Sequence, residues 1–120
     1  MIVCTLDNFL GNPDVLKAEG VYVFTLTFSG TYPVGGDTLN FAVQGVLSNA
    51  APTEGKIYEQ PTVASGNVFT GYQFCLAKGT TAANNKLQIN SAQGVPFSGS
   101  YGTTFASTIV KARVHFPLGQ

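Results

Sequence analysis

The chain has 120 residues and is only 10% charged, against about 25% in an average soluble domain, and its six acidic and six basic residues give a formal net charge of zero. This length predicts a single domain, and the nine Phe and five Tyr argue against intrinsic disorder. No nucleic-acid partner is expected because Lys and Arg do not cluster, and no membrane partner because no apolar run approaches the roughly 20 residues of a membrane helix.

The first twenty residues are predicted to form an N-terminal arm that carries the only helix of the domain. Residues 1–11 are mixed in character and fit either an arm or an edge strand, and they lack the basic and long apolar regions of a signal peptide. After them, Asn12 can act as an N-cap, Pro13 suits the first helical position and Gly20 can end a helix of about two turns. Residues 21–120 are then the β core.

Five further segments alternate apolar and polar residues with the period of β-strands: residues 21–28, 37–41, 67–77, 86–90 and 106–116. Each of them has one apolar side, which is expected to face the core. The core-facing residues are Tyr22, Phe24, Leu26, Phe28, Leu39, Phe41, Tyr72, Phe74, Leu76, Leu87, Ile89, Val110, Ala112, Val114 and Phe116. A shorter segment, 56–60, is followed by Pro61, which confines it to a sheet edge or a bend.

The connecting segments are rich in Gly, Pro, Asn and Ser. Residues 78–85 predict a turn that joins the strands on either side of it into a hairpin. Residues 42–55 predict a long loop, and residues 93–104 predict another, with Phe97 and Tyr101 as isolated anchors. Short strands separated by such turns predict an all-β fold, an antiparallel β-sandwich or jelly-roll-like barrel, with one short N-terminal helix.

No catalytic, metal-binding or cofactor-binding residues are predicted. His115 is the single histidine, and it lies on the polar side of the last strand beside Lys111 and Arg113, with no acid or nucleophile nearby in sequence, so we expect it at the solvated surface. The two cysteines form no metal-binding motif. Cys75 lies in an apolar run and is expected to be buried, Cys4 fits a free thiol, and a disulfide between them stays open as an alternative.

Three tyrosines lie in or near loops, where an exposed ring can stack on a sugar or a buried ring can anchor the loop. They are Tyr32, Tyr58 and Tyr101, and the absence of Trp favours anchoring. The segment 35–37, Gly-Gly-Asp, matches only a fragment of a calcium loop, and a calcium site needs several spaced oxygen ligands. Neither pattern predicts a binding site.

The charges are unevenly distributed along the chain. All six acids lie in residues 1–59, where Lys17 and Lys56 are the only bases, a net charge of −4. Residues 60–120 have no acid and a net charge of +4, carried by Lys78, Lys86, Lys111 and Arg113. Either strands from the two halves interleave, which we favour, or the halves form faces that meet across subunits. In both cases contacts are expected between acids of the first half and bases of the second.

Three stretches carry a family resemblance. In the first, residues 22–41, a strand ending Thr-Phe-Ser-Gly-Thr-Tyr leads into Gly-Gly-Asp-Thr-Leu-Asn-Phe. In the second, residues 71–94, Gly-Tyr-Gln-Phe precedes Asn-Asn-Lys-Leu-Gln-Ile-Asn and a Ser-Ala-Gln-Gly loop. The third is the predicted closing strand, residues 108–116. In this order the stretches cover about half of the chain and resemble a family of small virion structural proteins of tailed bacteriophages. Residues 1–20 and 42–66 depart from that pattern.

The resemblance implies a non-enzymatic decoration or cement protein that binds and stabilises the assembled phage head from outside. Its expected partners are the major capsid protein and further copies of itself, with a trimer favoured over a dimer. It is expected to be made in the host cytoplasm and to reside on the capsid surface of the virion, without a cofactor. The alternatives are another phage part, from the tail or the head–tail junction, and a carbohydrate-binding β-sandwich module.

Overall fold

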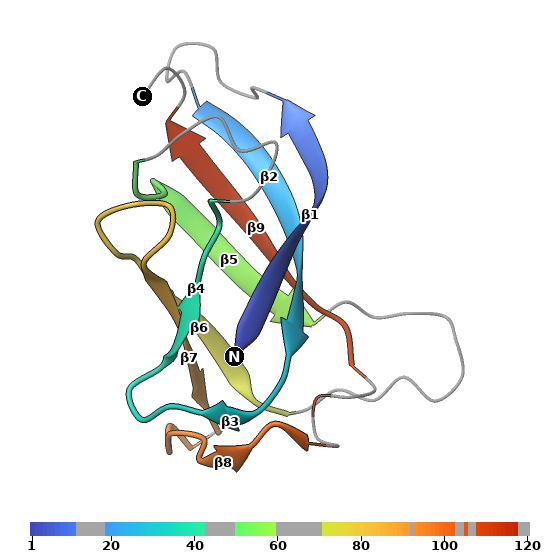
Figure 1. The fold of residues 1–120 in the computed structure, drawn as a ribbon, viewed down its shortest axis with the longest axis vertical. Helices are drawn as coiled ribbons and strands as arrows, with labels where there is room; N and C mark the ends of the chain where they lie inside the picture. The colour runs from blue at the N-terminus through green and yellow to red at the C-terminus, as the bar shows by residue number, and fades with distance from the viewer. Residues whose placement is uncertain are drawn as a thin grey trace.

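The computed structural model describes residues 1–11, 19–42, 50–59, 71–91, 93–102, 105 and 108–117. These residues form β-strands in antiparallel sheets and contain no α-helix, which confirms the all-β prediction for this part of the chain (Figure 1). The strands are β1 (Ile2–Gly11), β2 (Glu19–Phe28), β3 (Thr31–Tyr32), β4 (Asp37–Leu39), β5 (Glu54–Glu59), β6 (Gln73–Ala77), β7 (Asn85–Asn90), β8 (Gly99–Ser100) and β9 (Val110–Pro117).

The largest sheet has four strands in the order β1-β2-β9-β5. Its two central strands are those with the clearest alternation in the sequence, and their apolar sides face the core as predicted, with Phe24 and Val114 fully buried. Of the two alternatives for residues 1–11, arm or edge strand, the structure contains the edge strand. Its pairing with β2 shifts register between Leu6 and Asn8, and such bulges discourage further pairing at a sheet edge.

The second sheet has three strands in the order β4-β7-β6, and it contains the predicted β6–β7 hairpin. The hairpin turn is held by side chains of two asparagines. The Asn84 Oδ1 atom accepts hydrogen bonds from the backbone N–H groups of Thr80 and Thr81, both at 2.9 Å, and the buried Asn85 accepts one from Gly79 N–H at 2.8 Å. A Cβ atom at Gly79 would collide with the backbone of Asn84, so this turn requires glycine there.

The two sheets share one hydrophobic core. The ring of Phe41, just after β4, lies 4.9 Å from that of Phe24 and 6.0 Å from that of Phe116. The same buried cluster includes Leu87 and Ile89 of the second sheet. At the sheet edges β1 lies beside β4, and β5 lies beside β6 (Figure 1). The approach of β5 and β6 is close, because a Cβ atom at Gly55 would lie 2.5 Å from the Cδ2 atom of Leu76.

β3 pairs with β8 at one end of the molecule (Figure 1). An aromatic cluster fills the core there. The rings of Phe28 and Tyr101 lie 5.0 Å apart, those of Tyr32 and Phe97 lie 5.7 Å apart, and those of Tyr101 and Phe105 lie 5.3 Å apart. Phe97 and Tyr101 therefore anchor their segment to the core, as the sequence predicted.

The predicted N-terminal helix is not seen. Residues 12–18 lie outside the described part of the chain, and the prediction that Gly20 ends a helix is wrong, because Glu19 and Gly20 begin β2. Gly20 pairs with Phe116, so hydrogen bonding to β9 outweighs the weak local helix signal. The predicted strand over residues 67–77 is described only from residue 71 onward, and of the predicted long loop residues 43–49 are not described.

Candidate functional site

The outer side of the four-stranded sheet carries a ladder of charged residues, which we call the charged face. Three cross-strand pairs between β5 and β9 define its rows: Tyr58 with Lys111, Lys56 with Arg113, and Glu54 with His115. Thr25 of β2 extends the first row, and Asp7 of β1 contacts the same row. Because strand register sets these rows, residues from both halves of the sequence lie side by side.

The first row is a closed hydrogen-bond network. Lys111 Nζ donates to the Asp7 Oδ2 atom at 2.6 Å and to the Thr25 hydroxyl oxygen at 3.1 Å, and the Thr25 hydroxyl donates to the same Asp7 oxygen at 2.5 Å. Partial burial alone would raise the pKa of Asp7, but the hydrogen bonds from Lys111 and Thr25 and the lysine charge outweigh it, so the pKa lies below its ordinary value. Asp7 is therefore ionised near neutral pH and forms an ion pair with Lys111.

The third row places His115 Nδ1 3.3 Å from the Glu54 Oε1 atom. His115 lies on the outer side of β9, but its side chain is only 20% exposed, less than the solvated position predicted. The acid that sequence proximity did not supply comes from β5. This pair and the Asp7–Lys111 pair each join the first half of the chain to the second. They confirm that the two halves interleave, because β9 lies between β2 and β5.

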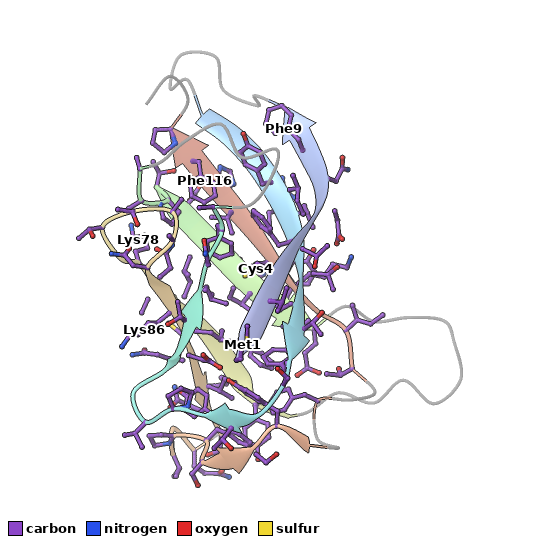
Figure 2. All side chains as sticks on the ribbon, viewed as in Figure 1. Met1, Cys4, Phe9, Lys78, Lys86 and Phe116 are labelled. Carbon is purple, nitrogen blue, oxygen red and sulfur yellow. The ribbon has the colours of Figure 1, made fainter. Side chains whose placement is uncertain are left out.

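The outer side of the three-stranded sheet differs in chemistry, and we call it the neutral face. Its outward residues on β6 and β7 are Gln73 paired with Asn90 and Cys75 paired with Gln88. Lys86 lies on the same side near the beginning of β7 and is the charged residue of this set (Figure 2). The prediction that Cys75 is buried is wrong, because its neighbours in β6 turn toward the core and alternation directs Cys75 outward.

A groove of about 420 Å³ borders the neutral face, between the residue 33–36 turn and residues 96–98. Gln88 and Asn90 line one part of it, and Phe97 lines another. Val34, which also lines the groove, is 101% exposed at the tip of a turn. A hydrogen bond from the N–H of residue 36 to the carbonyl of residue 33 closes this turn, and residue 35 is a glycine at a φ of 90°.

Sequence reasoning missed the groove, although one signal was present. An apolar residue between proline and two glycines, as Val34 is, must project from a turn. Val95, on the chain beside the groove-lining Pro96, is also exposed, at 61%. Away from Met1 and β1, Val34 and Val95 are the exposed large hydrophobic residues of the described chain.

Two of the three loop tyrosines are buried, and their hydroxyl groups form hydrogen bonds. The Tyr32 hydroxyl accepts a hydrogen bond from the Ile89 N–H at 3.2 Å, and the Tyr101 hydroxyl donates to the Asp37 carboxylate at 2.6 Å. Burial, together with the Asp37 charge, raises the pKa of Tyr101. Both rings are buried and anchor loops, with Tyr32 also at the wall of the groove, whereas Tyr58 lies on the charged face.

Asp37 belongs to the calcium-like fragment, and its carboxylate is buried and bound by groups of the protein itself. Besides Tyr101, the backbone N–H of Thr38 donates to it at 2.8 Å, and the amino group of Met1 lies 3.0 Å from it. Among the described residues, no three His, Cys, Asp or Glu side chains gather as a metal site. The fragment therefore serves the fold of β4.

Both cysteines are free thiols. Cys4 lies in the interior between the two sheets (Figure 2), where burial raises the pKa of its thiol to about 12 in spite of a backbone hydrogen bond at Asn40. A thiol with such a pKa stays protonated and unreactive at neutral pH. Cys75 lies on the outer side of the other sheet, so the two thiols do not form the bridge left open by the sequence.

Comparisons with protein-family models, with curated proteins and with solved structures found no match. In the described ranges, no helix is long and apolar enough to cross a membrane.

Proposed function

We propose that this protein is a non-enzymatic structural component of a phage virion, a decoration or cement protein that binds and stabilises the assembled head. The observation that carries this proposal is the neutral face with its groove and the exposed Val34 and Val95. Uncharged, partly apolar surface of this kind is typical of the centre of protein–protein interfaces. The order of the three resembling stretches in the sequence supports the same assignment.

We further propose that the two sheets form a β-sandwich related to the jelly roll. They share one core, and their edges lie next to each other at β1 and β4 and at β5 and β6. A sandwich has two outer faces that point in opposite directions. One face of a decoration protein can then contact the major capsid protein while other surfaces contact neighbouring copies, and a closed trimer is the arrangement we favour over a dimer.

Cryo-electron microscopy of the parent virion tests the location. We expect density for this protein at repeated lattice positions on the outside of the head. Density confined to the tail or the head–tail junction would replace this assignment with the other phage part, and a virion without the protein would contradict both.

A binding measurement tests the role of the neutral face. Heads stripped of the protein should lose heat resistance and regain it when the protein is added back, because a ligand that binds only the assembled lattice stabilises it. The Val34→Asp variant, which adds a charge at a wholly exposed site, should fold but restore much less resistance. Lys86→Gln is the matched control on the same sheet and should behave as the unaltered protein.

A carbohydrate-binding module is the second candidate, and one observation favours it. The amide side chains of Gln88 and Asn90 line the groove together with Phe97, a combination that can hydrogen-bond and stack on a sugar. A glycan array with saturable hits that are lost in Gln88→Ala would support this candidate. An array without hits would remove it.

A further inference from the structure

The middle row of the charged face places two cations directly opposite each other. Lys56 of β5 pairs in register with Arg113 of β9, and both side chains are exposed. Like charges directly opposite on an antiparallel pair destabilise it. The rows on either side, roughly 7 Å away along the strands, contain a base matched to an acid. The middle row is therefore the one row of the three in which a base has no acid as its partner.

The nearest acids already have partners. Asp7 is bound by Lys111 at 2.6 Å and by Thr25, and Glu54 lies 3.3 Å from His115. Among the described residues, no acid forms an ion pair with the two cations of the middle row. The described residues therefore supply no ion-pair partner for this row, which leaves both exposed cations open to an acid from another molecule.

The surroundings of the two cations suit a carboxylate. A hollow of about 160 Å³ beside them is lined by Glu54, Lys56, Arg113 and His115. The guanidinium of an arginine holds a carboxylate through two parallel hydrogen bonds, and a neighbouring lysine adds a point charge. The half-buried Val23 next to Arg113 in the same row provides apolar contact beside the charge.

We propose that the Lys56–Arg113 row is a docking site for an acidic segment of another protein, one that presents one or two carboxylates. A long polyanion such as nucleic acid is disfavoured, because Asp7 and Glu54 flank the row on its two sides and would repel the phosphates beyond it. A short acidic segment in the hollow meets only Glu54, whose carboxylate already has His115 as a partner. This site lies on the charged face, so it does not depend on the phage-head assignment.

The test is an NMR titration of the isotope-labelled full chain with a blocked peptide, Gly-Glu-Gly-Glu-Gly. We expect saturable shifts of backbone amides in β5 and β9 around the middle row, weakened by added salt. The Lys56→Gln, Arg113→Gln double variant should bind about tenfold more weakly or not at all, since a charged hydrogen-bonded pair is lost. The neutral control peptide Gly-Gln-Gly-Gln-Gly should leave these amides unchanged, and Lys86→Gln should bind as the unaltered protein does.

A charge reversal separates docking from folding. Lys56→Glu places an acid opposite Arg113, so we expect a higher midpoint of urea unfolding together with complete loss of peptide binding. A lower midpoint would mean that the row is compensated within the chain and would overturn the inference. So would tighter binding of a DNA duplex or inorganic phosphate than of the acidic peptide, or the same shifts produced by protein concentration alone, which would make a second copy the occupant.

Discussion

The charged and neutral faces are both the outer sides of antiparallel sheets, but they present different kinds of side chain to the solvent. On the charged face, β9 lies between two strands from the acidic half of the chain, so bases and acids meet in two of three rows. On the neutral face, β6 and β7 come from the other half, which has no acid, and their outward residues between Lys86 and Asn90 are mostly amides. A net charge of zero thus conceals one ionic surface and one surface on which Lys86 is the charged residue among the outward positions of β6 and β7.

The largest effect on stability is expected in the hydrophobic core that lies between the two faces. Phe24 of β2 is fully buried and contacts Phe41, which follows β4. Phe24→Ala should lower the free energy of unfolding by about 3–5 kcal/mol, because it removes a buried ring and leaves a cavity. Phe9→Ala, at a half-exposed ring, is the control and should cost clearly less. Urea unfolding followed at amides of both sheets should show one transition; two separate transitions would mean that the sheets do not share a core.

A smaller effect is expected beneath the neutral face, where Tyr101 donates to the buried Asp37. Tyr101→Phe removes this donor while keeping the ring, and should cost about 1–3 kcal/mol because a buried carboxylate loses a hydrogen bond. Tyr58→Phe, on the charged face, is the matched control and should change stability little. Equal costs for the two variants in thermal or urea unfolding would show that the Tyr101–Asp37 bond does not form in solution.

Local periodicity predicted β2, β6, β7 and β9, but it left β1 open and did not specify which strands are neighbours. The alternation in residues 21–28 and 110–116 fixes which side is buried, because one face of each strand must leave water. The pairing of Lys56 with Arg113 depends on two segments more than fifty residues apart, and nothing local specifies that register. For the same reason the acid beside His115 was not foreseen.

Local signals also misled in two places. The caps around Asn12 and Gly20 suggested a helix, yet at Gly20 the pairing with β9 determines the conformation. Cys75 was expected inside because its neighbours are apolar, although strict alternation with Phe74 directs it outward. In both cases the tertiary context outweighed composition. The groove beside Val34 arises from two loops far apart in sequence, so only its exposed valine had a local signal.

The charged face should respond to pH, and the neutral face should not. The pKa of Asp7 is lowered in the folded protein, so its bond to Lys111 contributes stability above the unfolded value of about 3.9 and loses it as pH falls through the folded pKa. Asp7→Asn should therefore cost up to about 1 kcal/mol at pH 7, less in high salt, and almost nothing at strongly acidic pH. Urea midpoints across this range measure it.

Two controls sharpen this prediction. Glu54→Gln should have a smaller effect at pH 7, because the Glu54 side chain is 68% exposed and its pair with His115 is screened by water. Gln88→Ala on the neutral face should show the same small change in stability at every pH and salt concentration. A pH-dependent change in the Gln88 variant would contradict the contrast between the ionic charged face and the mostly amide neutral face.

The smallest effect on stability is expected at the tip of the residue 33–36 turn. Val34 is wholly exposed, so Val34→Ser should change the free energy of unfolding by less than about 0.5 kcal/mol at low protein concentration. If the neutral face mediates assembly, the same variant should shift the mass measured by light scattering toward the monomer, while Lys56→Gln leaves it unchanged. In the opposite result, assembly survives Val34→Ser and is lost in Lys56→Gln. Association would then depend on the two unpaired cations of the charged face and not on the groove, so the roles of the two faces would be exchanged.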